Sequence, residues 1–226
     1  MPYFRQDNIL FIHIPKTGGT SVEQYFCQKY KMRLDARSLS SNRPIPKYNS
    51  SLQHMTYETI INNKDEFKLN MENLTIITIV RNPYNRIISD LFYYKLITVN
   101  NSKDEVYNII KQYVTEYKGN ILQYKFVTID NHNIPQYKFV TIDNHNIPQY
   151  KFVTINKELI PNITILRTES LKYDMANIGY TDFNIKINAN KNNIDCYDYL
   201  NDESIKLIND FYDYDFTLFG YVKIPL

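Results

Sequence analysis

Three runs of apolar residues in the chain are continuous rather than alternating. They cover Ile9 to Ile14, interrupted only by His13, then Leu74 to Val80, and finally Ile163 to Leu166. Continuous runs of this length, rich in β-branched residues, are typical of strands buried on both faces of a parallel sheet. The pattern therefore predicts three core strands, and the third of them ends at Arg167.

Helical spacing appears between and after these runs. Apolar residues recur every three or four positions in segments that begin after Ser21, at Pro83, at Ser102 and at Asn201. Pro83 suits the first turn of a helix, and acidic residues follow Ser102 and Asn201, as at many helix starts. A shorter helix is expected after Thr56, a candidate N-cap. Helices that alternate with apolar strands predict an α/β fold with a mainly parallel sheet.

Three further boundaries follow from single residues. The helix that opens at Ser102 is expected to stop at Gly119. Residues 33–51 are polar, and Pro44 and Pro46 forbid a continuous helix, so this segment is expected to be an irregular loop. Residues 216–221 are expected to form an aromatic tail after the last helix.

Length and composition restrict the class of protein. With 226 residues, 43% of them hydrophobic, the chain is expected to form a single domain over residues 1–226, with a tandem repeat at 123–161 as an insertion. The net charge is only +2, so the totals favour neither bulk nucleic-acid binding nor a membrane surface. The two cysteines give no disulfide framework and no zinc-ligand spacing.

The apolar runs also bear on the compartment. They are too short to span a bilayer, and residues 1–8 lack the apolar core of a signal peptide. We therefore expect a soluble protein, cytoplasmic or otherwise intracellular.

The middle of the chain contains the repeat. Residues 123–135 and 136–148 are identical, and residues 149–161 begin with the same sequence before they diverge. Each copy has a β-prone core, Tyr-Lys-Phe-Val-Thr-Ile, followed by Asp/Asn-rich turn chemistry and a proline, so a small hairpin-like meander is one possible shape. We interpret the repeat as a tolerated surface insertion of two extra units. His132 and His145 occupy equivalent positions, but no third ligand for a metal is evident.

A polar loop joins the first apolar run to the first helical segment. Its sequence is His-Ile-Pro-Lys-Thr-Gly-Gly-Thr-Ser, from His13 to Ser21. A proline and two consecutive glycines bend the backbone sharply and let its amides approach a ligand. Amides at a helix start attract anions, and the loop adds an ammonium group and hydroxyls as donors. The sequence therefore predicts a site for a phosphate-like anion, formed by Lys16, Thr17, Gly18, Gly19, Thr20 and Ser21.

A second candidate anion-binding group follows the next apolar run. Arg81 comes directly after the strand predicted at residues 74–80, and Ser89 lies on the following helix. Ligands of α/β sheets gather at the carboxyl ends of strands, so Arg81 and the first loop should face one crevice if their strands are neighbours. An arginine fork and a serine hydroxyl together hold a phosphate well.

These two segments resemble the donor-binding loops of sulfotransferases that use PAPS, 3′-phosphoadenosine 5′-phosphosulfate. Pro-Lys-Thr-Gly-Gly-Thr-Ser after a strand is similar to the 5′-phosphosulfate loop of that family, and residues 80–89 resemble its 3′-phosphate loop. Residues 166–171 and the Phe-Gly-Tyr at 219–221 are similar to segments of the carbohydrate (Golgi-type) sulfotransferases and their small soluble relatives. The resemblance implies a P-loop-like three-layer fold with a central, mainly parallel sheet flanked by helices.

The resemblance also implies an enzyme that transfers a sulfuryl group in line from PAPS to an acceptor hydroxyl, on a carbohydrate, without a metal. Lys16 would neutralise charge that grows on the bridging oxygen. His54 is the candidate base, because imidazole titrates near neutral pH and related carbohydrate enzymes are similar in placing a histidine after the first helix. A structural role for His54 beside the short helix stays open. Glu23 is the next candidate base, although a solvated carboxylate is the favoured interpretation, and His13 is expected to serve packing.

Other functions and details stay open at this point. A nucleotide kinase or triphosphatase would share the fold, but Lys16 precedes both glycines, and no obvious Mg-binding Asp follows residues 74–80. A catalytically inactive binding protein could keep the nucleotide pocket and recruit a partner through the repeat. Protein tyrosine or a small alcohol remains open as the acceptor. The repeat also leaves open whether Gln123, Gln136 or Gln149 occupies the position of the Gln-Tyr-x-Phe segment found in the resembled group.

Overall fold

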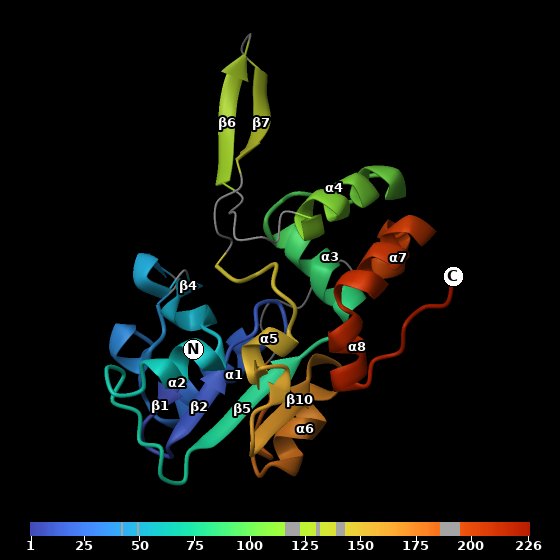
Figure 1. Cartoon of the computed structure of the whole chain (residues 1–226). Helices are drawn as coiled ribbons and strands as arrows, with labels where there is room; N and C mark the ends of the chain where they lie inside the picture. The colour runs from blue at the N-terminus through green and yellow to red at the C-terminus, as the bar shows by residue number, and fades with distance from the viewer. Residues whose placement is uncertain (42, 49, 116–122, 130–131, 139–142, 186–194) are drawn as a thin grey trace.

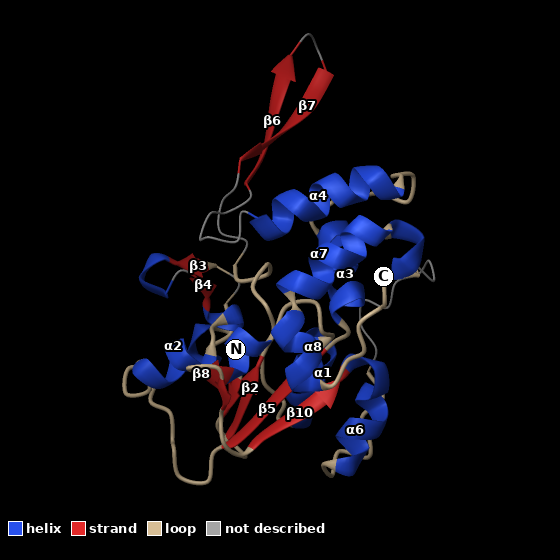
Figure 2. Cartoon of the chain, turned by 45° about the vertical axis from the view of Figure 1, so that its right-hand side comes forward, coloured by secondary structure: helices blue, strands red, loops and turns tan. Residues whose placement is uncertain are grey.

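The structure of the chain is a computed structural model. It describes the whole of residues 1–226 except residues 42, 49, 116–122, 130–131, 139–142 and 186–194. A central sheet is flanked by helices, further helices lie beyond one end of its strands, and a two-stranded hairpin projects away from the rest (Figures 1 and 2).

The central sheet has four strands in the order β1, β2, β5, β10. Their bounds are β1 (Tyr3–Phe4), β2 (Ile9–Ile12), β5 (Thr75–Val80) and β10 (Ile163–Arg167). β1 is antiparallel to β2, whereas β2 and β10 both run parallel to β5, with Leu10 opposite Ile76 and Arg167 opposite Val80. The three strands predicted from the continuous apolar runs are therefore present, and the prediction of a mainly parallel sheet is confirmed.

Both faces of the sheet are buried, which explains why the runs are continuous. On one face, Phe11, Ile77 and Leu166 pack against α1 (Gly19–Lys29) and α6 (Leu171–Asn177). On the other face, a second cluster includes strand residues and residues from α2 (Tyr57–Asn62), α5 (Tyr150–Val153) and the end of α8 (Asp213–Phe219), namely Leu10, Ile12, Ile76, Val80, Ile60, Phe152, Val153 and Phe219. Successive apolar residues of the strands thus alternate between two cores, which is why apolar residues follow one another instead of alternating with polar ones.

A separate helical core lies beyond the carboxyl ends of the strands. It is built from α3 (Pro83–Tyr93), α4 (Lys103–Thr115), α7 (Asp202–Phe211) and α8, with Tyr84, Leu91, Ile110, Ile208 and Phe216 among its buried residues. The predicted caps are confirmed: Asn201 caps α7 through Ser204 N, Thr56 caps α2 through Thr59 N, and Pro83 stands in the first turn of α3. The predicted stop at Gly119 lies outside the described residues.

The predicted aromatic tail is wrong. Residues 213–219 form the helix α8, which ends at Gly220 with φ of 64°. Phe216 and Phe219 are three positions apart and both buried, so they follow helical spacing that a short, aromatic segment obscured.

The remaining elements are short. Two small antiparallel ribbons pair β3 (Pro44–Ile45) with β4 (Ser50–Ser51) and β8 (Thr154–Ile155) with β9 (Glu158–Leu159). Single 3-10 turns cover Ala36–Ser38, Pro46–Tyr48, Leu52–His54, Thr168–Ser170 and Cys196–Tyr199.

The repeat adopts more than one structure. β6 (Gln123–Ile129) pairs with β7 (His132–Lys138) in an antiparallel hairpin that projects from the body (Figure 1). β7 crosses from the first copy into the second, so a strand does not coincide with one copy. In the third copy, the same Tyr-Lys-Phe-Val sequence forms the helix α5 instead. The projecting hairpin thus contains most of the first copy and the start of the second, and the third copy forms a small ribbon of its own from β8 and β9.

Candidate active site at the carboxyl ends of the strands

The two predicted anion-binding segments meet at one edge of the sheet. The loop after β2 and the residue after β5 lie at the carboxyl ends of adjacent parallel strands. The guanidinium of Arg81 donates from Nη1 to the carbonyl oxygen of Lys16 at 3.1 Å. The strands are neighbours, as that prediction required, and Arg81 contacts the loop.

The loop has the conformation of an anion-binding turn. The φ angle is 67° at Lys16 and 86° at Gly18, and Gly18 is the N-cap of α1. Among the described residues no side chain caps α1, and its first turn contains no acidic residue. The positive end of this helix is therefore not offset by a cap or a carboxylate of its own first turn, which suits an anionic ligand.

The second glycine of the loop is required by its contact with His13. A Cβ atom at Gly19 would lie 2.7 Å from both Cδ2 and Nε2 of the His13 ring, closer than packing allows. The imidazole is buried and held at Nδ1 by Glu23 Oε1 at 2.5 Å. A side chain at position 19 would displace the ring or the loop.

The hydroxyl groups of the loop lie in different environments. Thr17 is fully buried, and its Oγ1 donates to the carbonyl of Ile14 at 2.8 Å. Thr168 Oγ1 in turn donates to the carbonyl of Thr17 at 2.6 Å. Ser21 is buried in the first turn of α1, whereas Thr20 is exposed. The Thr17 hydroxyl thus stabilises the loop itself, and Thr20 faces solvent.

Gln149 fixes the backbone at Arg81. Arg81 N donates to Gln149 Oε1 at 2.9 Å, and Gln149 Nε2 donates back to the Arg81 carbonyl at 2.8 Å. The backbone N–H of Gln149 donates to Asp215 Oδ2 at 2.8 Å. Of the three repeated glutamines, Gln149 is therefore the one beside the anion loop, whereas Gln123 and Gln136 belong to β6 and β7. Ser89, the predicted companion of Arg81, lies on α3 and is partly exposed.

A second arginine binds the backbone of the loop from a buried position. Arg86 is 1% exposed, and its Nε donates to the carbonyl of Pro15 at 3.0 Å. Its two other nitrogens donate to the carbonyls of Ile147 at 2.9 Å and His145 at 2.8 Å. Arg86 thus ties the anion loop to the end of the second repeat copy, a role that the sequence did not reveal.

Lys16 lies over an exposed aromatic ring. Its Nζ is 4.1 Å from the centroid of the Tyr93 ring, which is a cation–π contact. Burial lowers the pKa of Lys16, and the nearby Asp90 carboxylate opposes that shift. Tyr93 is 60% exposed and stacks on the His145 ring with centroids 5.6 Å apart.

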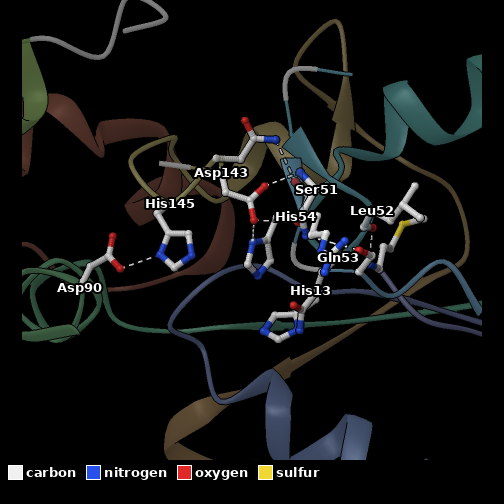
Figure 3. Close-up of polar contacts among 12 residues, drawn as sticks. His13, Ser51, Leu52, Gln53, His54, Asp90, Asp143 and His145 are labelled. Carbon is white, nitrogen blue, oxygen red and sulfur yellow. Dashed lines mark hydrogen bonds and ion pairs between the residues drawn. The ribbon is translucent and has the colours of Figure 1, made fainter. Parts of the chain in front are cut away.

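His54, the predicted base, forms a hydrogen-bonded pair with Asp143. His54 Nδ1 lies 2.6 Å from Asp143 Oδ2, and Asn144 Nδ2 donates to the His54 carbonyl at 2.8 Å (Figure 3). Burial lowers the pKa of His54 to about 3, although Asp143 acts in the opposite direction. The imidazole is therefore neutral near pH 7, and because Nδ1 donates its proton to the carboxylate, Nε2 is the unprotonated nitrogen.

Two further histidine–carboxylate pairs flank His54. His145 Nδ1 lies 2.7 Å from Oδ1 of the buried Asp90, on one side. On the other side lies the pair of His13 and Glu23. The His54 ring makes edge contacts with His13 and His145, at centroid distances of 5.2 and 5.0 Å (Figure 3). The histidine row, defined as His13, His54 and His145, runs from the anion loop to the Tyr93 ring.

The expectation of a solvated Glu23 is wrong. Glu23 is 5% exposed, and the partner His13 and a Gln53 amide at 3.1 Å lower its pKa against the effect of burial. From its place on the first helix, Glu23 was expected to face solvent. In the structure this position of α1 faces the histidine row instead. The buried position of His13 agrees with the packing role expected for it, and its ion pair with Glu23 adds to that role.

The part of the chain that the structure describes contains neither a membrane-spanning helix nor a cluster of metal ligands. No helix there is long and apolar enough to cross a membrane. In the same residues, no group of three or more His, Cys, Asp or Glu side chains could hold a metal ion.

An anion loop at the end of one strand and an arginine at the end of its neighbour define a transferase or nucleotide-binding site of the α/β type. The family model described as "Sulfotransferase family" matches residues 3–222. The chain therefore belongs to the sulfotransferase family, whose reaction is sulfuryl transfer. Neither the curated proteins nor the solved structures compared with the chain contain a match.

Several site residues had no readable signal in the sequence. Asp90, Asp143 and His145 are short polar residues in an α3 segment and in Asn-rich repeats, where turn or surface roles are the ordinary expectation. Glu23 is four residues from Gly19, a helical spacing that gave the only hint of a position facing the loop. The pairing of each carboxylate with a histidine becomes visible only in three dimensions.

Proposed function

We propose that this protein transfers a sulfuryl group from PAPS to the hydroxyl of an acceptor, and that the acceptor is a carbohydrate. The observation that carries the proposal is the juxtaposition of the anion loop, Arg81 and the histidine row at one end of the sheet. Family membership supports sulfuryl transfer in general. The identity of the donor and the class of the acceptor go beyond family membership, and we propose them from the geometry of the site.

The donor would bind across two strand ends. Backbone amides at the start of α1 suit the 5′-phosphosulfate, and the guanidinium of Arg81 suits the 3′-phosphate of the nucleotide. The residues proposed to bind the donor are Lys16, Thr17, Gly18, Gly19, Thr20, Ser21, Arg81 and Ser89. Thr17 would contribute through its backbone, since its hydroxyl already donates to Ile14.

Lys16 would act on the leaving group. In the transfer, the acceptor oxygen forms a bond to sulfur while the bond between sulfur and the bridging oxygen breaks. The electron pair of the broken bond stays on the phosphate, and the Lys16 ammonium neutralises that growing charge. Because Nζ lies over the exposed Tyr93 ring rather than in a buried ion pair, it can move to the donor without breaking a salt bridge.

His54 would accept the proton of the acceptor hydroxyl at Nε2. Its pKa of about 3 keeps this nitrogen unprotonated at neutral pH but makes the imidazole a weak base. The negative charge of a bound donor raises the pKa of a neighbouring histidine, and Asp143 stabilises the imidazolium that forms. No step of this scheme requires a metal ion.

The carbohydrate acceptor is supported by the aromatic ring next to the site. Tyr93 is 60% exposed, lies beside Lys16 and stacks on His145. An exposed ring in this position offers a stacking face to the apolar side of a sugar. Tyr57, in contrast, is 9% exposed and belongs to the core, so it offers no such face.

The test uses PAPS labelled in its sulfuryl group, with oligosaccharides, a tyrosine peptide and a small alcohol as acceptors. We expect label in an oligosaccharide, and we expect His54→Gln to abolish this transfer. His132→Gln is the matched control for His54→Gln, because it makes the same substitution at a histidine that lies on the projecting β7. Transfer to the peptide alone would contradict the acceptor class. Phosphate transfer from ATP, with no turnover of PAPS, would contradict the proposed function.

A further inference from the structure

The end of the second repeat copy lies at the candidate site, whereas the identical first copy forms much of the projecting hairpin. Residues 143–148, which end the second copy, run beside the histidine row. The side chain of Asp143 reaches His54, that of His145 reaches Asp90, and the backbone of Ile147 accepts from Arg86. One copy of the repeat therefore supplies residues that contact the histidine row.

Asp143 makes more contacts than a surface carboxylate needs. Its Oδ1 accepts from the backbone N–H of Ser51 at 2.5 Å, and its Oδ2 accepts from Ser51 Oγ at 2.7 Å. Oδ2 also accepts from His54 Nδ1 at 2.6 Å. Hydrogen bonds from His54 and Ser51 lower the pKa of Asp143 against the effect of burial, so the carboxylate stays ionised. Every group that faces it is a donor.

We infer that Asp143 is a positioning residue for the proposed base: it fixes His54 in the tautomer that carries the proton on Nδ1 and leaves Nε2 unprotonated. The inference rests on the proposed function for its role in the reaction. It also assigns a function to the repeat, because the copy that ends at Pro148 supplies this carboxylate.

The geometry predicts what an amide at this position would do. The backbone N–H of Ser51 can only donate, so it requires an oxygen at the place of Asp143 Oδ1. In the Asp143→Asn variant the amide nitrogen must then take the place of Oδ2, where it faces His54 Nδ1. Since the amide nitrogen also only donates, Nδ1 has to lose its proton, and the proton moves to Nε2. The base is then blocked without a change in side-chain volume.

The tautomer of each histidine is measured directly by ¹⁵N NMR of histidine-labelled protein. The chain has only 4 histidines, so His54→Gln and His132→Gln assign the signals of those two residues. In the unsubstituted protein we expect His54 to show a protonated Nδ1 and an unprotonated Nε2. In Asp143→Asn we expect the two nitrogens to exchange roles, while turnover of PAPS falls at least about a hundredfold, a loss typical of a disabled general base.

A deletion gives the matched control. Removal of residues 123–135 produces the same sequence as removal of residues 136–148, because the two copies are identical. The shortened chain keeps one copy of Asp-Asn-His-Asn-Ile-Pro before Gln149. We expect this variant to keep both the His54 tautomer and the turnover of the full chain. Loss of either would contradict the assignment of the site residues to a single copy.

The outcomes separate this inference from the proposed function. An unchanged His54 tautomer in Asp143→Asn would overturn the inference, whatever the activity. Exchange of the tautomer with unchanged PAPS turnover would remove His54 from the reaction and overturn both the role of Asp143 in it and the proposed base. Exchange of the tautomer in a protein that never turns over PAPS would contradict the proposed function alone and would leave the positioning of His54 intact.

Discussion

The loop of residues 13–21 and the histidine row lie side by side but are built in opposite ways. The loop is a continuous segment, residues 13–21, and its shape depends on local features, a left-handed Gly18 and the start of α1. The histidine row and the three carboxylates paired with it come from different segments of the chain. His54 and Asp143, for example, are far apart in sequence but form one pair. A local element can be recognised from sequence, whereas an element assembled by tertiary contacts cannot.

The difference also appears in the electrostatics. The loop has no described carboxylate in the first helical turn and collects positive charge from Lys16 and Arg81. Each histidine of the row lies within hydrogen-bond distance of a carboxylate, as in His145 with Asp90. Positive charge therefore gathers at the loop, whereas every histidine of the row has a carboxylate beside it.

The largest expected effect separates the chemical role of the loop from its binding role. Lys16→Met should lower kcat by about 10²- to 10³-fold, because the ammonium acts on charge that develops only in the transition state. The affinity for PAPS should fall much less. Steady-state kinetics and calorimetry on the same protein measure both quantities. Lys29→Met, an equivalent change in the last turn of α1, is the control; equal losses of kcat and affinity in Lys16→Met would contradict the role.

An intermediate effect tests the contact between the two regions. Gly19→Ala places a methyl group against the His13 ring and should reduce the free energy of unfolding by about 1–3 kcal/mol, the usual cost of overpacking. Denaturant unfolding measures this loss. In a His13→Ala background the same substitution should cost much less, because the ring is gone. An identical cost in both backgrounds would show that the two regions do not meet at this point.

The smallest expected effect concerns the row. The pKa of His54 is about 3 in the folded protein and near 6.5 when unfolded, so between these values only the unfolded chain binds the proton. Stability should therefore fall as the pH decreases below about 6.5. From pH 7 to pH 5.5 the loss should be about 1 kcal/mol larger than in His54→Gln.

Another buried group acts in the opposite direction in that experiment. Burial raises the pKa of Asp215 to about 6, so its folded state binds a proton first and gains stability as the pH falls. The same term is present in His54→Gln and cancels in the comparison. Equal pH dependence of the two proteins, followed by denaturant unfolding, would show that His54 is not held neutral by burial.

The sequence predicted the local parts of the structure and missed the tertiary ones. The core strands, the caps Thr56 and Asn201 and the approach of Arg81 to the loop follow from short patterns and from the adjacency of strand ends. Glu23 was expected in solvent because a single helix position does not say which neighbour will cover it. Asp143 and His145 were interpreted as part of an insertion because the other copy of their sequence is identical.

The repeat shows most directly that a short sequence does not by itself decide its own conformation. The sequence Tyr-Lys-Phe-Val lies in strand β6 at residues 124–127 and in helix α5 at residues 150–153. In α5, Phe152 and Val153 are buried in the core against the sheet, and Asp215 accepts hydrogen bonds from the backbone N–H groups of Gln149 and Tyr150 at its start. Tertiary contacts therefore decide the conformation of this segment over its β propensity.

The most direct test of the account is a calorimetric titration with 3′,5′-phosphoadenosine, the product that PAPS leaves behind, beside ADP and ATP without metal. We predict tight binding of the 3′,5′-bisphosphate, weak binding of ADP, and a loss of at least about tenfold in Arg81→Ala, as expected for a lost charge-assisted hydrogen bond. Equal or tighter binding of ATP, or bisphosphate binding that does not depend on Arg81, would contradict the assignment of these two strand ends as a PAPS site.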